Sequence, residues 1–106
     1  KLVFITDTRF TEDLVSFASR IQPPDLLISE GMYGDESMRP KDWDVPHMTF
    51  AEAAKVASAS GARLLWLTHY SPMMADPSRY IENARRIFPN AIAAHDGTEI
   101  SLSYED

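Results

Sequence analysis

Apolar residues in this chain gather in three short, uninterrupted runs, at residues 2–6, 26–29 and 64–68. Stretches with helical spacing separate these runs. A strand that is covered on both faces has a continuous apolar sequence, whereas a strand with one solvated face alternates apolar and polar positions. The pattern therefore predicts an α/β fold with a largely parallel sheet that is covered on at least one face.

The first helical stretch follows the first apolar run. Thr11 suits the position before a helix, because its hydroxyl can accept a hydrogen bond from the first free N–H groups. Apolar side chains then recur at the spacing of one helix face, at Leu14, Phe17, Ala18 and Ile21. Prolines at 23 and 24 end the pattern. This stretch predicts an amphipathic helix with one apolar stripe.

Two further helices are predicted mainly from their boundaries. Thr49 and Glu52 match a capping box, in which each side chain binds the other residue's N–H, and Gly61 closes the alanine-rich helix that follows. Asp76 and Pro77 are typical of the start of a third helix. The apolar face of that helix comprises Tyr80, Ile81, Ala84, Ile87 and Phe88.

The C-terminal residues predict a hairpin. Residues 91–95 and 99–104 form two strand-like segments, and Asp96-Gly97 between them favours a two-residue turn. The predicted order of elements is βαβαβαββ, an α/β layer with an antiparallel edge. Residues 31–48 show no sustained period, and a loop of that length in a compact domain is usually either a functional lid or disordered.

Composition narrows the class of protein. The 106 residues suffice for one domain, and 44% hydrophobic with 25% charged residues is ordinary for a globular protein. The net charge is −6 and the ten Lys and Arg residues are scattered. Because phosphate contacts need basic residues, we expect any nucleic acid to be bound mainly by residues outside this chain. The sequence has no cysteine, no signal peptide and no 18-residue apolar run, from which we expect a cytoplasmic protein without a membrane partner.

Each of the three apolar runs ends on a side chain that can bind metal or move protons: Asp7, Glu30 and His69. The carboxyl ends of parallel strands meet at one edge of a sheet, so we expect these residues on a shared rim, where functional crevices lie. Each residue also has a structural alternative. Asp7 suits a turn or helix cap, Glu30 a solvent-facing turn, and His69 a hydrogen-bonded loop.

Two further histidines differ in their setting. His47 precedes the capping box, where its ring is free to reach the crevice and to exchange a proton near neutral pH. His95 lies beside the Asp96-Gly97 turn and is expected to be structural. Asp7 and His69 suit zinc or manganese, but a catalytic zinc takes about three protein ligands, so this chain is short of ligands.

Five segments together resemble the C-terminal half of ribonuclease Z, the tRNA 3′-processing endonuclease with a metallo-β-lactamase fold. Residues 6–9, Thr-Asp-Thr-Arg, resemble the family's Gly-Asp-Thr segment, and residues 29–32, Ser-Glu-Gly-Met, resemble its His-Glu-Ala-Thr motif. Residues 47–49, His-Met-Thr, are similar to the His-Ser-Thr motif. Residues 67–72 resemble the Leu-Thr-His-Phe-Ser segment, and residues 87–90 the ending of the last helix. In order and spacing, these segments cover nearly the whole chain.

The resemblance implies a role for each candidate. Asp7 would bridge two zinc ions, with manganese as the alternative metal, and His69 would bind one of them. His47 would donate a proton to the leaving 3′ oxygen, supported by Glu30. The remaining ligands, a His-x-His-x-Asp-His motif and one more histidine, would come from an N-terminal half that these 106 residues lack. The implied reaction is metal-assisted hydrolysis of a phosphodiester in precursor tRNA.

A half-fold has two expected properties. The isolated segment should have little or no activity, because two ligands cannot hold a dimetal centre. The sheet face that normally meets the other half should be apolar and exposed, which favours a homodimer or aggregation.

Departures from the family's motifs leave two alternatives open. They occur at Thr6, Phe10, Ser29, Gly31 and Met32. One alternative is another phosphodiesterase of the superfamily, which acts on a small or cyclic nucleotide or on a different ester. The other is a non-catalytic acidic α/β interaction module, in which the rim residues are only caps and turns.

Overall fold

The computed structural model describes residues 1–20, 22–41 and 46–98. Four strands form one sheet in the order β1-β2-β3-β4, and every neighbouring pair is parallel. The strands are β1 (Leu2–Ile5), β2 (Leu26–Glu30), β3 (Leu65–Thr68) and β4 (Ala91–Ala93). The three apolar runs thus form three adjacent strands, as predicted.

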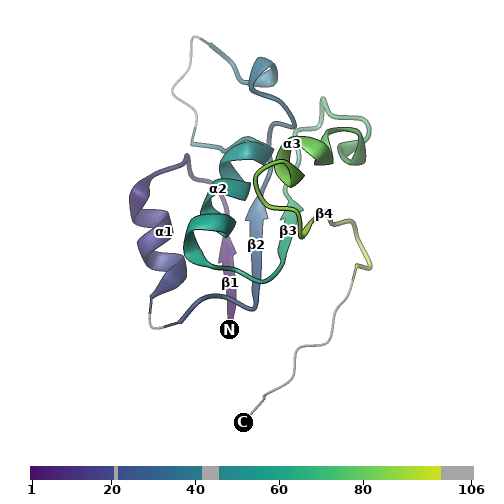
Figure 1. Ribbon diagram of the computed structural model, residues 1–106. Coiled ribbons are helices and arrows are strands. Elements are labelled where there is room, and N and C mark those ends of the chain that lie inside the picture. Colours follow the sequence, from purple (N-terminus) through teal and green to yellow (C-terminus); the bar gives the residue numbers. More distant parts are fainter. Residues whose placement is uncertain (21, 42–45, 99–106) are drawn as a thin grey trace.

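Helices connect the successive strands: α1 (Glu12–Ser19), α2 (Phe50–Ser60) and α3 (Ile81–Arg85), with 3-10 turns at Glu36–Met38 and Pro77–Tyr80. Connections between parallel strands are almost always right-handed, so strands added in sequential order place their helices on one face. In Figure 1, α2 lies over β2 and β3, with α1 and α3 on either side of it. The fold therefore has one layer of helices and one sheet. No helix among the described residues combines the length and apolarity needed to cross a membrane.

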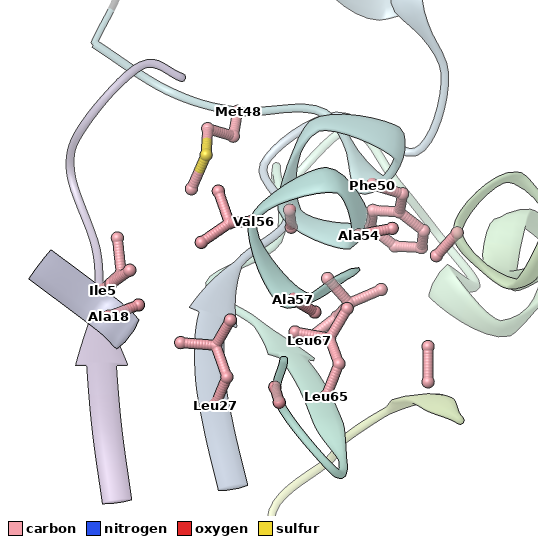
Figure 2. Close-up of a cluster of buried hydrophobic side chains, with 14 of the residues drawn as sticks. Ile5, Ala18, Leu27, Met48, Phe50, Ala54, Val56, Ala57, Leu65 and Leu67 are labelled. Carbon is pink, nitrogen blue, oxygen red and sulfur yellow. The ribbon is translucent and has the colours of Figure 1, made fainter. Parts of the chain in front are cut away.

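The hydrophobic core fills the space between α2 and the sheet (Figure 2). Leu27, Leu65 and Leu67 of the strands are fully buried there. The helix meets them with a face of mostly small side chains: Phe50, Ala53, Ala54, Val56 and Ala57. Because alanine extends only one carbon from the backbone, α2 can approach the sheet closely, as its composition predicts.

The opposite face of the sheet is apolar and partly exposed. Side chains alternate along β1, so that Leu2 and Phe4 point away from the buried Val3 and remain 57% and 58% exposed. The register aligns Phe4 with Ile28 of β2, and Ile28 with Trp66 of β3. The described part of the chain places none of its helices on this face. Exposed apolar surfaces of this kind usually mark an interaction site.

The capping box of α2 is present in both directions. The Thr49 hydroxyl accepts a hydrogen bond from the Glu52 N–H at 3.1 Å, and the Glu52 carboxylate accepts from the Thr49 N–H at 3.0 Å. Gly61 ends the helix in the left-handed region, with φ 75°. These local signals predicted α2 correctly, because capping involves residues that are near one another in sequence.

The apolar stripe predicted for the first helix is partly wrong. Ala18 is fully buried, but Phe17 is 59% exposed. The reason is that β1 is an edge strand among the described residues, which place no further strand beneath the outer side of α1. Thr11 occupies the position before α1, but its side chain makes no capping hydrogen bond. Ile21 lies outside the described residues.

The third predicted helix is shorter than expected. The Asp76 carboxylate accepts hydrogen bonds from the N–H and hydroxyl of Ser78, and the first turn, Pro77–Tyr80, is a 3-10 turn. The α-helical part ends at Arg85. Beyond it, the N–H groups of Ile87 and Phe88 both bind the Ala84 carbonyl, at 3.0 and 2.8 Å. A single α-helix through Phe88 is therefore wrong, because the Ile87 N–H binds the carbonyl three residues back instead of four, which interrupts the α-helical pattern.

The predicted C-terminal hairpin is described only in part. Residues 91–93 form β4, which is parallel to β3. The turn is present: the Thr98 N–H binds the His95 carbonyl at 2.9 Å, and Gly97 has φ 93°. The returning strand at 99–104 lies outside the described residues, so the antiparallel edge stays a prediction.

The two ends of the long loop after β2 are tied together. Tyr33 forms an isolated parallel bridge with Thr49, and its carbonyl accepts a hydrogen bond from the Phe50 N–H at 2.9 Å. The Tyr33 N–H in turn binds the Met48 carbonyl at 3.4 Å. This pairing returns the chain to the end of β2 just before α2 begins. A lid function for residues 31–48 stays a prediction, and residues 42–45 lie outside the described residues.

Gly31, directly after β2, makes room for Phe50. A Cβ atom at Gly31 would lie 2.7 Å from two ring carbons of Phe50 and 3.3 Å from a methyl group of Leu67. Phe50 is fully buried, so its ring has little room to move. The departure from alanine in the His-Glu-Ala-Thr motif therefore has a steric reason in this chain.

We expect Gly31→Ala to lower the free energy of unfolding by about 1–3 kcal/mol, the usual effect of overpacking a core. In a Phe50→Ala background, the same substitution should be nearly neutral, because the ring that it would meet is gone. Urea unfolding of the four proteins in this cycle measures both effects. An equal loss of stability in the two backgrounds would contradict the steric explanation.

Candidate metal centre

Three segments that are far apart in sequence bring side chains that could hold a metal ion together at the carboxyl edge of the sheet. Asp7 follows β1, His69 follows β3, and His47 lies at the end of the long loop. One potential ligand atom of each residue lies within 4.8 Å of the other two. The Nε2 atom of His69 is 3.4 Å from Oδ1 of Asp7. The convergence of Asp7 and His69 that the strand ends predicted is therefore observed.

Asp7 and His69 share an unusual backbone conformation. Asp7 has φ 54° and His69 has φ 56°, and they are the only non-glycine residues with positive φ in the described ranges. A left-handed non-glycine residue costs about 1–3 kcal/mol and persists only where surrounding contacts enforce it. Such residues concentrate at functional sites. Here the strain falls on the two residues that the sequence predicts to be metal ligands.

Glu30 lies beneath this cluster and is completely buried. Its carboxylate accepts hydrogen bonds from the Thr8 N–H at 3.0 Å and from the Met48 N–H at 2.9 Å. The same carboxylate lies 3.1 Å from Nδ1 of His47. A buried carboxylate requires such partners, because it loses its hydration on folding. The alternative of a solvent-facing turn residue is therefore wrong for Glu30.

The ring of His47 is held on two sides. Glu30 faces its Nδ1 atom, and the edge of Tyr33 meets it with ring centroids 6.4 Å apart and planes at 81°. On a third side, the His69 ring lies 5.9 Å away. When Nδ1 carries the proton that Glu30 accepts, Nε2 is the nitrogen that remains for a metal or a substrate. The contact of Glu30 with Nδ1 thus determines that Nε2 is the nitrogen of His47 that can bind a metal or a substrate.

Two members of this arrangement were not predicted. The sequence suggested His47 as a proton donor, but not that its ring would lie within ligand distance of Asp7 and His69. Tyr33 lies in the stretch 31–48, which has no sustained period from which a role could be predicted. His95, predicted to be structural, is exposed, and its Nδ1 lies 2.9 Å from the Asp96 carbonyl oxygen. It does not belong to the cluster.

The chemistry of the donor set fits a divalent metal. Zinc accepts imidazole nitrogen and carboxylate oxygen, and a set without sulfur also suits manganese. The side chains of Asp7 and His69 remain 65% and 45% exposed, which leaves space for further ligands, water or a substrate. The three residues present are compatible with part or all of one catalytic metal site.

Tyr70, the residue after His69, is anchored to the protein core. Its hydroxyl oxygen lies 2.6 Å from the carbonyl oxygens of both Leu67 and Ala94. Its ring is tilted against the Phe50 ring, with centroids 6.0 Å apart. Burial raises the pKa of the Tyr70 phenol to about 12, so that the hydroxyl remains a hydrogen-bond donor at neutral pH.

Comparison with known proteins places the chain in a family. Residues 1–70 match the family model described as "Beta-lactamase superfamily domain". The crystal structure of the metallo-beta-lactamase fold protein YhfI from Bacillus subtilis is similar, with a TM-score of 0.64 and 26% sequence identity. That similarity covers 85% of this chain and 34% of YhfI.

Curated relatives confirm the resemblance to ribonuclease Z. Ribonuclease Z of Lachnospira eligens is 41% identical over all 106 residues, and that of Clostridium acetobutylicum is also 41% identical over the same length. Ribonuclease Z of Clostridium perfringens is 44% identical over 105 residues. The chain spans about a third of the length of these relatives: 34%, 33% and 32%, respectively. With its fold, its family match and these relatives in agreement, the chain belongs to the beta-lactamase superfamily.

Proposed function

We propose that this chain is the C-terminal segment of a ribonuclease Z-like hydrolase, a metal-dependent endoribonuclease that removes the 3′ trailer of precursor tRNA. The observation that carries the proposal is the grouping of Asp7, His47 and His69 above the buried Glu30. The similarity of the whole chain to curated ribonuclease Z proteins supports it. A cytoplasmic location is part of the same proposal and rests on the sequence alone.

The remainder of the active site would come from an N-terminal part of the same protein. Two observations support this division. The chain corresponds to about a third of its relatives' length. It also has an apolar sheet face on which Leu2 and Phe4 are more than half exposed. A second layer of the domain, packed on that face, would cover these side chains and bring further metal ligands.

Asp7 and His69 are the residues that would hold metal, with zinc as the first candidate and manganese as the second. Bound metal would supply Lewis-acid stabilisation of the charge that develops on the phosphoryl oxygens. The backbone at Asp7 and His69 contributes by orienting the carboxylate and the imidazole before metal arrives. Pre-organised ligands of this kind need little rearrangement on binding.

His47 would act as the general acid. Its Nδ1 atom is held by Glu30, so its Nε2 atom is available to give a proton to the leaving 3′ oxygen. Glu30 is the positioning residue, because it orients the ring without reaching the substrate itself. Tyr33 limits rotation of the ring from the other side.

A second candidate is a phosphodiesterase of the same superfamily that acts on a small or cyclic nucleotide. The net charge of −6 favours this candidate, because tRNA binding depends on basic residues. In the first proposal those residues belong to the rest of the protein. Cleavage assays with precursor tRNA and with cyclic nucleotides on the full-length protein separate the two.

We expect Asp7→Asn and His69→Ala to weaken zinc binding. Loss of a residue that merely supports a ligand lowers metal affinity about 10–100-fold, so loss of the ligand should cost at least as much. Zinc titration of the full-length protein against a competing chelator measures the change. His95→Ala is the matched control, because this histidine lies outside the cluster. Unchanged affinity in His69→Ala would remove its proposed role.

We expect His47→Ala to slow precursor tRNA cleavage about 10²–10⁴-fold, the usual contribution of a general acid. Because the proton donor is not a ligand in this proposal, the bound zinc should stay at the wild-type level. Single-turnover cleavage and elemental analysis of the same preparation test both points. A parallel loss of zinc would show that His47 is a ligand and contradict the assignment.

We expect residues 1–106, expressed alone, to associate through the apolar sheet face and to lack nuclease activity. Light scattering over a range of concentrations reports the association. Phe4→Lys should reduce it, because the substitution places a charge in the middle of that face. A monomer at high concentration would argue against the proposed second layer.

A further inference from the structure

The position of His69 depends on its backbone more than on its side chain. Within the described residues, its ring contacts Asp7 and His47, the other members of the cluster. The side chain is 45% exposed, so core packing does not hold it. Its left-handed φ of 56° would relax unless neighbouring groups restrained it. The question is therefore what restrains the chain around His69.

Backbone hydrogen bonds hold the residues before and after it. The Thr68 carbonyl accepts from the Gly31 N–H at 2.7 Å, and the Ser71 N–H binds the Met32 carbonyl at 3.0 Å. Both connect the turn after β3 to the residues that follow β2. Neither hydrogen bond involves Tyr70, which lies between His69 and Ser71. Tyr70 is fixed by its side chain instead.

The Tyr70 side chain folds back across the turn to reach the ends of two strands. Its hydroxyl lies within hydrogen-bond distance of the Leu67 carbonyl in β3 and of the Ala94 carbonyl just after β4. The Leu67 carbonyl also accepts from the Ala94 N–H at 2.9 Å. The hydroxyl therefore sits where β3 and β4 separate. Its ring packs on Phe50, which is fully buried at the start of α2.

We propose that Tyr70 is a positioning residue for His69, and that its hydroxyl, bound at the ends of β3 and β4, holds His69 in the left-handed conformation that aims the imidazole at Asp7. The proposal depends on the proposed function only in treating His69 as a metal ligand. The corresponding residue of the Leu-Thr-His-Phe-Ser segment is phenylalanine, so the hydroxyl is an addition in this chain. Tyr70 directly follows His69 in the chain. A fixed Tyr70 therefore restrains the backbone of His69.

Tyr70→Phe tests this role with little disturbance, because the ring that packs on Phe50 is kept. It removes the hydroxyl from the Ala94 carbonyl, whereas the Leu67 carbonyl keeps the Ala94 N–H as its partner. Tyr80→Phe is the matched control: the Tyr80 ring lies against Gly34, and the structure records no hydrogen bond of its hydroxyl among the described residues. Val56→Ala controls for a general loss of stability in the core of α2.

The first measurement is zinc affinity of the full-length protein, by competition with a chelator. We expect Tyr70→Phe to weaken zinc binding about tenfold, the lower end of the range for residues that support a ligand. Tyr80→Phe and Val56→Ala should leave it unchanged. If Tyr70→Phe leaves the zinc affinity unchanged and His69→Ala weakens it, the positioning role of Tyr70 is overturned and His69 is still supported as a metal ligand.

The second measurement needs no metal. In the metal-free protein, the three-bond coupling between the amide and α protons of His69 reports its φ by NMR. We expect Tyr70→Phe to shift this coupling away from the wild-type value, and Tyr80→Phe to leave it unchanged. An unshifted coupling in Tyr70→Phe overturns the proposal whether or not zinc binds. If the coupling shifts in Tyr70→Phe but His69→Ala does not change the zinc affinity, the positioning role of Tyr70 is supported and the role of His69 as a metal ligand is refuted.

Discussion

The buried carboxylate of Glu30 is the interaction on which the rest of the site depends. It accepts N–H hydrogen bonds from Thr8, after β1, and from Met48, before α2, and it faces Nδ1 of His47. These groups come from two segments, the turn after β1 and the residues before α2, and Glu30 joins both to β2. Without the carboxylate, two N–H groups would lose their partner, at about 1–3 kcal/mol for each group that stays buried. The position of the site is thus coupled to the stability of the sheet edge.

Strain and restraint are combined at the same edge. Asp7 and His69 adopt left-handed backbone conformations, which are unfavourable for residues other than glycine. Nearby hydrogen bonds offset this cost: Glu30 binds the Thr8 N–H next to Asp7, and Gly31 binds the Thr68 carbonyl next to His69. A rigid sheet edge therefore presents two side chains toward each other. This arrangement is expected of a site that binds an ion, because side chains that are already in position need little ordering when the ion binds.

The two faces of the sheet have different roles. One face is covered by α2 with small side chains and supports the core. The other face carries Leu2 and Phe4 and is free of the described helices. The edge that carries Asp7, Glu30 and His69 lies between these faces, at the ends of β1, β2 and β3. In the proposed full-length protein, a second layer on that face would enclose this edge from both sides.

Local patterns in the sequence determined the strands, the capping box of α2 and the residue at each strand end. These features depend on neighbours a few positions away, so they could be predicted without coordinates. The exposed Phe17 was mispredicted because burial depends on which strand lies beneath a helix. The length of α3 was mispredicted because the hydrogen-bond pattern changes after Arg85. Tertiary structure alone decided that Glu30 is buried, that His47 joins Asp7 and His69, and that Tyr70 reaches β4. Each of these contacts joins segments whose distance in space is set by the order of the strands.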